Sequence, residues 1–478
     1  MKIVFAASEA APFIKTGGLG DVASALPTAL SEYKGNEVMV FLPYYAAIKH
    51  NPLIAVEQLA VFETPLAWRR CYTGLFRLKS RKRKLQIYFI DNEQYFAREA
   101  IYGHYDDGER FAFFSRAILE SLVRLGKRPD VIHCNDWQTA LIPAMLHTFY
   151  GESLPGVRTV FTIHNIEYQG ITQPYFLCDT LGFPPSLENT FSFGGVLNFV
   201  KGAILTCDRL TTVSRTYAHE IRHPYFAHGL ASIIEEHAFK TSGIVNGIDT
   251  VTFDPATDSG IACHYSADDI AGKAACKAAL QRELGLPERP DVPLVALVSR
   301  LVGHKGLDIL CDAMDEMMGA ELQFVILGTG DSAYERRLSD MAARYGDKLS
   351  VNLRFSGALA SRIYAACDLY LMPSKSEPCG LSQLIAMRYG AVPIVHETGG
   401  LADTVPPFKV ESGEGLGFTF SQFNREDMLY ALWRALDVYY NDPAAFARVR
   451  DNGMRADLSW SKSAGEYMDL YRELTDLS

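Results

Sequence analysis

The sequence lacks the features that mark secreted, membrane-embedded and nucleic-acid-binding proteins. Its nine cysteines include no Cys-X-X-Cys pair, which favours reduced thiols over a disulfide framework. The N-terminus shows no signal-peptide pattern, and no apolar run reaches the roughly 18 residues of a membrane span. The net charge of −10 argues against a surface for nucleic acid or anionic lipid. We therefore expect a cytoplasmic protein without nucleic-acid or membrane partners.

The chain of 478 residues is too long for a single hydrophobic core. Strand-like and helix-like segments alternate up to about residue 249, polar Ala- and Asp-rich sequence follows, and the alternation then resumes. This pattern predicts an α/β protein with two doubly wound parallel sheets, in domains of residues 1–249 and 250–458. We expect residues 459–478 to form a helix that crosses back to the first domain.

The expected elements follow from apolar periodicity. The expected strands are 2–7, 37–42, 70–78, 85–90, 131–134, 157–163, 208–213, 242–245, 294–298, 323–327, 351–355, 369–372 and 392–395. The expected helices are 22–33, 107–125, 306–318, 333–345 and 463–474.

A glycine-rich segment, residues 15–22 (KTGGLGDV), lies between the first expected strand and the first expected helix. Gly17 and Gly18 would tolerate a positive φ and expose backbone amides, which attract an anion at a helix start. Lys15 adds a positive charge, and Asp21 would cap the helix or hold the loop through its hydrogen bonds. Because the segment is neither a Walker A nor a Gly-X-Gly-X-X-Gly motif, a turn that needs glycine for geometry alone is equally well supported.

Three polar residues in the first half come directly after expected strands. Asp136 follows the strand 131–134, and His164 and Asn165 follow the strand 157–163. Ligands of open α/β sheets bind beyond the carboxyl ends of the strands, which makes these residues site candidates by position. A histidine at a strand end is more often a structural hydrogen-bonding group, and that alternative stays open.

Two cations stand at a strand end in the second half. Arg300 follows the strand 294–298, and Lys305 precedes a helix. Two positive charges beside a helix start suit a diphosphate, because they neutralise charge that grows as a nucleotide leaves. A solvated basic loop is an equally supported alternative.

Residues 374–381 (SKSEPCGL) leave another strand and open another helix. The backbone amides of Cys379, Gly380 and Leu381 would bind phosphate or sugar hydroxyls there, and Glu377 would accept hydroxyl hydrogens. Residues 397–404 (ETGGLADT) echo the glycine-rich segment 15–22 and are expected to open a helix of their own.

Two further segments have a composition that is compatible with more than one role. Residues 80–84 (SRKRK) join two expected strands, and a solvated hairpin tip is favoured there over a localisation or nucleic-acid signal. Residues 91–103 are dense in aromatic and polar groups, and a ligand-contacting loop and a packed surface loop are equally supported.

Taken in order, these motifs closely resemble those of bacterial glycogen synthases and plant starch synthases. The match runs almost end to end and includes KTGGLGDV and residues 133–137, 162–165, 168–170, 246–249, 299–301, 305–306, 327–331, 377–381, 398–401 and 459–462. The resemblance implies a retaining glycosyltransferase with the GT-B fold, whose two Rossmann-like domains face each other across a cleft. It also implies transfer of glucose from ADP-glucose to the non-reducing 4-OH of an α-1,4-glucan.

The resemblance implies a role for each motif residue. The nucleotide-sugar site would comprise Lys15, Gly17, Gly18, Asp21, Asn246, Arg300, Lys305, Glu377, Cys379, Gly380, Leu381 and Thr398. The catalytic group would comprise His164 at the reacting sugar with Asp136, Arg300, Lys305 and Glu377. Glu9 and Tyr95 would lie on the acceptor side.

One position departs from the pattern of many retaining enzymes of this fold. They carry a second Glu eight residues after the first, where this chain has Ile385. No motif residue offers a nucleophile for a covalent intermediate, so we expect a front-face reaction in which the leaving phosphate helps to deprotonate the incoming 4-OH. The chain also contains no Asp-X-Asp, and we expect neither a metal nor a cofactor.

The motifs are also compatible with two functions other than an ADP-glucose-dependent synthase. Another retaining glucosyltransferase of this fold would prefer UDP-glucose or another acceptor, and an inactive homologue would only bind glucan. The intact Lys15, His164, Arg300, Lys305 and Glu377 favour an active enzyme. Glycogen phosphorylase shares the architecture but needs a pyridoxal-binding lysine in a longer chain, and this sequence lacks that context. The sequence makes no prediction of oligomeric state.

Overall fold

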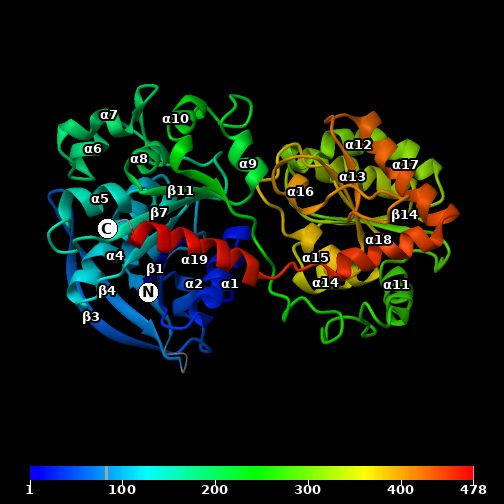
Figure 1. Cartoon of the computed structure of the whole chain (residues 1–478), viewed down its shortest axis with the longest axis horizontal. Helices are drawn as coiled ribbons and strands as arrows, with labels where there is room; N and C mark the ends of the chain where they lie inside the picture. Colours follow the sequence, from blue (N-terminus) through cyan, green and yellow to red (C-terminus); the bar gives the residue numbers. More distant parts are fainter. Residues whose placement is uncertain (81–83, 477–478) are drawn as a thin grey trace. The chain divides into compact units, whose positions relative to one another are not determined.

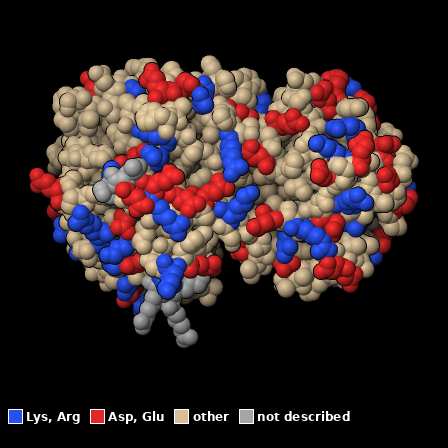
Figure 2. All heavy atoms as spheres, in the orientation of Figure 1, with Lys and Arg blue, Asp and Glu red and all other residues tan. Residues whose placement is uncertain are grey.

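The computed structural model describes residues 1–80 and 84–476. The chain forms two compact units, the first made of Met1–Asn246 with the chain from Trp460 on, and the second of Gly247–Ser459 (Figure 1). Residues 81–83 lie outside the described residues, so the hairpin tip expected at 80–84 stays a prediction. No helix within the described residues is long and apolar enough to cross a membrane. Acidic and basic side chains are interspersed over the visible surface (Figure 2).

A nine-stranded sheet forms the centre of the first unit. In sheet order its strands are β12 (Thr241–Gly243), β11 (Arg209–Thr212), β7 (Arg158–Ile163), β6 (Val131–Asn135), β1 (Lys2–Ala6), β2 (Glu37–Pro43), β5 (Leu85–Asp91), β4 (Arg69–Leu78) and β3 (Val56–Leu66). The strands from β12 to β5 run parallel, and β4 and β3 add an antiparallel edge. A small separate sheet consists of β8 (Ile171–Thr172), β10 (Val196–Asn198) and β9 (Ser192–Phe193).

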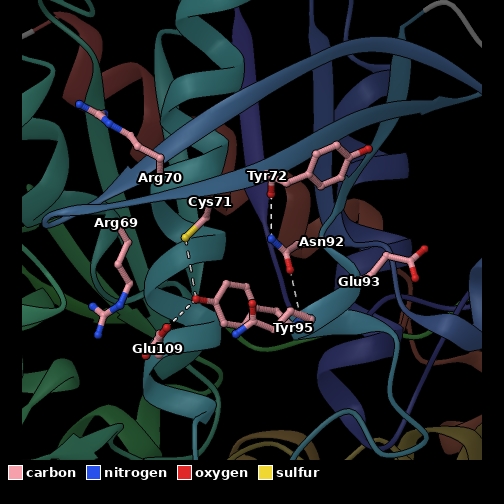
Figure 3. Close-up of a pocket in the computed structure, with 9 residues that line it drawn as sticks. Arg69, Arg70, Cys71, Tyr72, Asn92, Glu93, Tyr95 and Glu109 are labelled. Atoms are coloured by element: carbon pink, nitrogen blue, oxygen red, sulfur yellow. Dashed lines mark hydrogen bonds between the residues drawn. The ribbon is translucent and has the colours of Figure 1, made fainter.

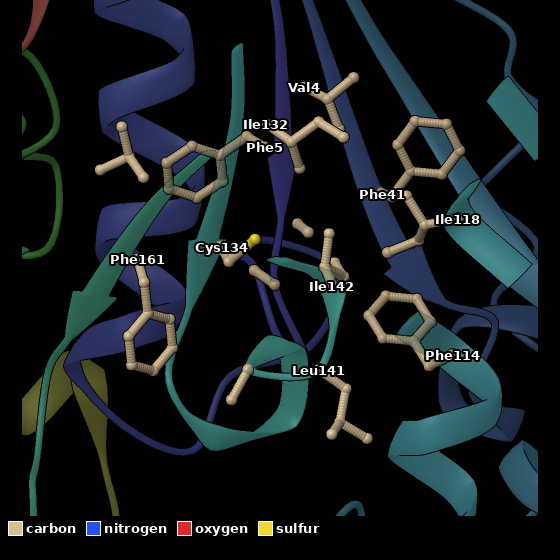
Figure 4. Packing of buried hydrophobic residues seen from close by; sticks show 14 of the residues in the cluster. Val4, Phe5, Phe41, Phe114, Ile118, Ile132, Cys134, Leu141, Ile142 and Phe161 are labelled. Carbon is tan, nitrogen blue, oxygen red and sulfur yellow. The ribbon is translucent and has the colours of Figure 1, made fainter. Parts of the chain in front are cut away.

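The longer helices of the first unit are α1 (Gly18–Glu32), α4 (Asp107–Arg124), α5 (Ile142–Phe149), α8 (Phe199–Thr206) and α19 (Trp460–Asp476). The shorter ones are α2 (Ala46–Lys49), α3 (Glu93–Phe96), α6 (Phe176–Asp179), α7 (Glu188–Phe191), α9 (Arg215–Glu220), α10 (Ala231–Glu236) and the 3₁₀ turns η1 (Trp137–Thr139), η2 (Pro185–Leu187) and η3 (Ala238–Lys240). Phe114 and Ile118 lie four residues apart on one face of α4 and pack beside Phe41 of β2 (Figure 4).

The final helix, α19, belongs to the first unit. Its apolar stripe, Tyr467, Leu470, Tyr471 and Leu474, is buried in the same hydrophobic cluster as the strands. The Tyr471 hydroxyl lies 2.6 Å from Nδ1 of His133 on β6. Helix α19 therefore forms part of the same hydrophobic core as the strands of the first unit.

A six-stranded, fully parallel sheet forms the centre of the second unit. Its order is β15 (Leu349–Asn352), β14 (Gln323–Leu327), β13 (Leu294–Val298), β16 (Leu369–Met372), β17 (Val392–His396) and β18 (Phe418–Phe420). The helices are α11 (Ala271–Glu283), α12 (Leu307–Gly319), α13 (Ser332–Arg344), α14 (Gly357–Ala366), α15 (Ser382–Arg388), α16 (Gly399–Thr404), α17 (Arg425–Asn441), α18 (Pro443–Arg455) and the 3₁₀ turn η4 (Gly303–Lys305).

Alternate residues of the second sheet enter two different hydrophobic clusters. Val295 and Leu297 of β13 pack with α12 and α17, whereas Leu294 and Ala296 pack with α11 and α14. Because successive side chains of a strand point to opposite faces, both faces of this sheet are covered by helices. The predicted fold class, α/β with two parallel sheets, is confirmed.

Two expected strands have different bounds, and five strands were not expected. The strand expected at 351–355 ends at Asn352, and Phe355 is 90% exposed. The chain leaves the sheet there because Ser356 caps α14, accepting the amide of Leu359 at 3.2 Å. The strand expected at 242–245 is β12, which ends at Gly243. The strands that were not predicted are β3, β8, β9, β10 and β18.

Candidate active site

The glycine-rich segment 15–22 connects β1 to α1. Gly17 precedes the helix with φ −156° and ψ −165°, an extended conformation, and Gly18 has no positive φ either. The tolerance of glycine for a positive φ is therefore not used at either position. A Cβ added to Gly17 would find no neighbour closer than Glu9 Oε1, at 4.0 Å. No side chain caps α1, and of its first amides that of Gly20 donates to the Gly17 carbonyl at 3.2 Å.

Side chains of this segment are held by two contacts. Asp21 accepts a hydrogen bond from Lys15 Nζ at 2.7 Å and does not cap the helix, so the loop-holding alternative is the one observed. Glu9 is buried, and its Oε2 accepts the Thr16 amide at 2.5 Å and the Thr16 hydroxyl at 2.8 Å. Burial raises the pKa of Glu9, and the hydrogen bonds from Thr16 oppose that rise.

Asp136 and His164 meet at the ends of the neighbouring strands β6 and β7. Asp136 has a positive φ of 56°, rare for a residue with a side chain. Its Oδ1 accepts the backbone amides of His164 at 2.7 Å and Asn165 at 3.4 Å. Burial raises the pKa of Asp136 to about 7, although these two amides lower it. Asp136 therefore fixes the backbone on which His164 stands.

The imidazole of His164 contacts a residue that sequence analysis did not single out. Its Nε2 lies 2.9 Å from Oδ1 of Asn135, the last residue of β6. Burial lowers the pKa of His164 to about 3, so the ring is neutral near pH 7. The position of Asn135, at a strand end beside Asp136, was the signal that could have identified it.

Asn246, the last residue of the first unit's main segment, is also buried. Its Oδ1 has no hydrogen-bond partner among the described residues. A buried carbonyl oxygen without a donor is costly and is often completed by a ligand or water.

In the second unit, Lys305 and Glu377 form an ion pair. Lys305 Nζ lies 2.5 Å from Glu377 Oε2, and both side chains are largely buried. The Ser374 hydroxyl donates to the same oxygen at 3.0 Å. The two predicted ligands from the loops after β13 and β16 are therefore brought together, 72 residues apart in sequence.

Two glycines lock the loops around this pair. Gly306 has φ 77°, and a Cβ there would stand 1.8 Å from the Pro373 carbonyl oxygen. Gly399 has φ 46°, and a Cβ there would stand 2.0 Å from the carbonyl oxygen of Glu377. No side chain beyond hydrogen fits at either position, so the loops after β13, β16 and β17 pack backbone against backbone.

The remaining predicted residues of this unit lie around the same loops. Gln383, which was not predicted, donates its amide to the carbonyls of Cys379 at 3.1 Å and Gly380 at 2.9 Å. Leu381 precedes α15 and Thr398 is buried before α16. Arg300 is exposed and forms no ion pair within the part of the chain described. Ile385 is buried in a hydrophobic cluster of this unit.

Tyr95 borders a cavity of about 500 Å³ in the first unit (Figure 3). The cavity is lined by Arg69, Arg70, Cys71, Tyr72, Asn92, Glu93, Gln94, Tyr95 and Glu109. The Tyr95 ring is buried, 5.1 Å from that of Phe113, and its hydroxyl donates to Glu109 Oε1 at 2.6 Å. Tyr95 is therefore a wall of the cavity rather than an exposed platform.

Known proteins resemble this chain along its whole length. The starch synthase catalytic domain family matches residues 2–236, and the glycosyl transferases group 1 family matches residues 281–438. The glycogen synthases of Streptococcus equi subsp. equi and Clostridium novyi are 47% and 45% identical over 99% of this chain, and the match covers 100% and 99% of theirs. The chain belongs to the glycogen synthase family.

Solved structures agree with this membership. The catalytic domain of starch synthase IV from Arabidopsis thaliana, solved with ADP and acarbose, is 36% identical with a TM-score of 0.91, over 99% of both chains. Sucrose-phosphate synthase from Thermosynechococcus elongatus shares the fold at 19% identity, with a TM-score of 0.63 over 100% of both chains. The predictions of a GT-B fold and of a glucosyltransferase of glycogen synthesis are confirmed for this glycogen synthase family member.

Proposed function

We propose that this member of the glycogen synthase family transfers glucose from ADP-glucose to the non-reducing 4-OH of an α-1,4-glucan, with retention of configuration. The ion pair of Lys305 and Glu377 carries the proposal. It sets a cation 2.5 Å from a carboxylate on rigid loops, which suits the junction of a sugar nucleotide, where phosphate charge adjoins sugar hydroxyls. The starch synthase IV structure, which has ADP bound, supports the adenine nucleotide.

The proposed roles follow the chemistry of each group. Lys15, Arg300 and Lys305 neutralise the diphosphate, with the amides at Gly17 and Gly18. Glu377 and the backbone at Cys379, Gly380, Leu381 and Thr398 bind the sugar nucleotide, and the unpartnered Oδ1 of Asn246 accepts one of its hydroxyls. His164 stands at the reacting sugar, supported by Asp136. Glu9, which orders the loop at Thr16, and Tyr95 act on the acceptor side.

The reaction needs no protein nucleophile in this proposal. The bond from C1 of glucose to the phosphate oxygen breaks, the bond from C1 to the acceptor O4 forms on the same face, and the 4-OH proton passes to the departing phosphate. His164 stays neutral and neither gains nor loses a proton during these steps. Three cations of the chain offset the charge on the departing diphosphate, so we also propose that neither a metal nor a cofactor is required.

The test is an incorporation assay on a glycogen primer with ADP-glucose and UDP-glucose, each with and without EDTA. We expect turnover with ADP-glucose to be far faster and insensitive to EDTA. A preference for UDP-glucose would show that the donor assignment is wrong, and activity that is lost in EDTA and restored by magnesium would refute the metal-free reaction.

His164→Ala tests the placement of His164. We expect kcat to fall much more than the KM for ADP-glucose rises, because a group at the reacting carbon acts mainly in the transition state. An unchanged kcat with a raised KM would make His164 a binding residue only.

A further inference from the structure

We propose that Asn135 is a positioning residue that fixes the tautomer of His164, so that Nδ1 of the imidazole meets a hydroxyl of the donor sugar as a hydrogen-bond acceptor. The sugar contact rests on the proposed role of His164. The tautomer itself rests on the hydrogen bonds of the free protein.

The orientation of the Asn135 amide is set by two backbone carbonyls. Its Nδ2 donates to the carbonyl of Ala6 at 3.0 Å, and the carbonyl of His133 lies at 3.4 Å. Rotating the amide by 180° would turn Oδ1 toward these two oxygens and leave no hydrogen between them. The side chain is fully buried, so water does not relieve that repulsion. Oδ1 therefore faces His164.

The position of Asn135 is itself fixed. Its backbone amide donates to the Thr139 hydroxyl at 2.6 Å, and that hydroxyl donates back to the Asn135 carbonyl at 2.9 Å. Asn135 ends β6 and His164 directly follows β7. These two strands pair through Asn135 and Thr162. The acceptor oxygen is thus held by the sheet and not by a loop.

An oxygen that can only accept dictates which nitrogen of His164 carries the proton. Nε2 lies 2.9 Å from Oδ1 and must therefore be the N–H donor. Nδ1 then carries the lone pair. Within residues 1–80 and 84–476, Nδ1 has no protein partner, and it is not among the buried polar atoms that lack one, so it is open to solvent.

The backbone of His164 is fixed independently of the ring. Asp136 Oδ1 accepts the His164 amide at 2.7 Å, and Asp136 holds φ 56° to do so. With the backbone held by one residue and the ring by its neighbour, Nδ1 has one available direction. A sugar hydroxyl arriving there finds an acceptor and no donor, which selects a hydroxyl that gives its hydrogen to the protein.

The free enzyme tests the tautomer by NMR. With ¹⁵N-labelled histidine, His164 is assigned as the signal missing from His164→Gln, and at pH 7 we expect the two-nitrogen pattern of a neutral Nε2–H imidazole. A neutral Nδ1–H pattern, or an imidazolium, would overturn the inference about Asn135 without touching the proposed reaction.

Substitution of Asn135 tests the consequence. Asn135→Leu removes the acceptor, and we expect mixed tautomers and a kcat lower by about tenfold to a hundredfold, with the KM for ADP-glucose changed much less. A wild-type kcat in Asn135→Leu would overturn the proposal.

Asn198→Leu is the matched control for loss of a buried amide. Asn198 is as buried as Asn135 and donates to Gln169 Oε1 at 2.5 Å in the same unit. We expect this variant to lower the melting temperature yet keep the His164 signals of the wild type. If it also altered the tautomer, general loosening would explain both variants and the proposal would fall. If the wild-type protein shows the expected tautomer but His164→Ala keeps the wild-type kcat, the sugar contact alone is refuted.

Discussion

The two Thr-Gly-Gly-Leu segments, residues 16–19 and 398–401, look alike in sequence but use glycine for different physical reasons. Both lead from a parallel strand into a helix, α1 in the first unit and α16 in the second. Gly399 has φ 46° and would place a Cβ 2.0 Å from a backbone oxygen. Gly17 has φ −156° and would place its Cβ in open space, 4.0 Å from the nearest atom.

Glycine is therefore needed for close backbone packing at position 399 but not at position 17. In the second unit, glycine lets adjacent loops touch, and the Gly400 amide donates to the Glu377 carbonyl at 3.0 Å. That contact fixes the carboxylate that pairs with Lys305. In the first unit, Gly18 is exposed at the start of α1, whereas Leu19 and Gly20 are buried. The same motif is therefore a structural lock in the second unit, whereas its first glycine in the first unit has open space around it.

The largest effect should come from Gly399→Ala. A methyl group would collide with a backbone oxygen that cannot move away alone, so we expect a loss of about 4 kcal/mol or more in unfolding free energy. Gly17→Ala should cost less than about 1 kcal/mol and should lower activity more than stability. Thermal unfolding of both variants measures the contrast, and equal losses of stability would abolish the distinction between lock and surface.

Lys305→Ala should reduce kcat by roughly two to three decades, the scale of losing one transition-state donor. The effect of Lys15→Ala should be smaller, because Lys15 is 41% exposed and water screens its charge. Kinetics with ADP-glucose on a glycogen primer compares them. Lys305→Ala also leaves Glu377 buried without its cation, so Lys305→Ala with Glu377→Gln is the control for that secondary effect. Unchanged turnover in Lys305→Ala would place the essential charge elsewhere.

Asp136 should make activity depend on pH near neutrality. With a pKa of about 7, the carboxylate that holds the His164 amide is protonated in acid, and we expect kcat to fall roughly tenfold from pH 8 to pH 6. Asp136→Asn should remove this dependence of kcat on pH.

The same pKa makes stability depend on pH. The folded protein binds this proton more tightly than the unfolded chain, so Asp136 lowers stability as pH rises from about 4 to about 7. Asp136→Asn should therefore melt higher than the wild type at pH 8, and a lower melting temperature would contradict the assigned pKa.

Tyr95→Phe should have the smallest effect. It removes the hydroxyl that donates to Glu109 but keeps the buried ring, whose loss in Tyr95→Ala would disturb the core. We expect the KM for glucan to rise about threefold, consistent with one hydrogen bond, and the KM for ADP-glucose to stay constant. A change in the nucleotide-sugar KM alone would remove Tyr95 from the acceptor side.

The sequence predicted most of the sheet strands because each is an apolar run bounded by turn residues. It did not predict β3, whose side chains are mixed in burial along an antiparallel edge, or the two- and three-residue strands β8, β9, β10 and β18. It identified Asp136 and His164 from their places at strand ends, but not the hydrogen bonds that give them direction. The partner of Lys305 is 72 residues away, and periodicity carries no information about such a pairing.

The glycine motifs show why backbone conformation was harder to predict than location. A glycine signals that a side chain would be unfavourable, but not whether the reason is a left-handed φ, a neighbouring carbonyl or a ligand. Gly399 meets the first two conditions and Gly17 neither. Only the position of Glu377, on a different loop, separates the two cases.

The burial of α19 in the first unit has a consequence for synthesis on the ribosome. Nδ1 of His133, on β6, has the hydroxyl of Tyr471 as its hydrogen-bond partner. Tyr471 is synthesised 338 residues later. The second unit runs without interruption from Gly247 to Ser459, so every residue it needs emerges earlier. A nascent chain can therefore finish the later-encoded unit first, while the apolar residues of the first unit that α19 covers stay exposed until residues 460–476 have been synthesised.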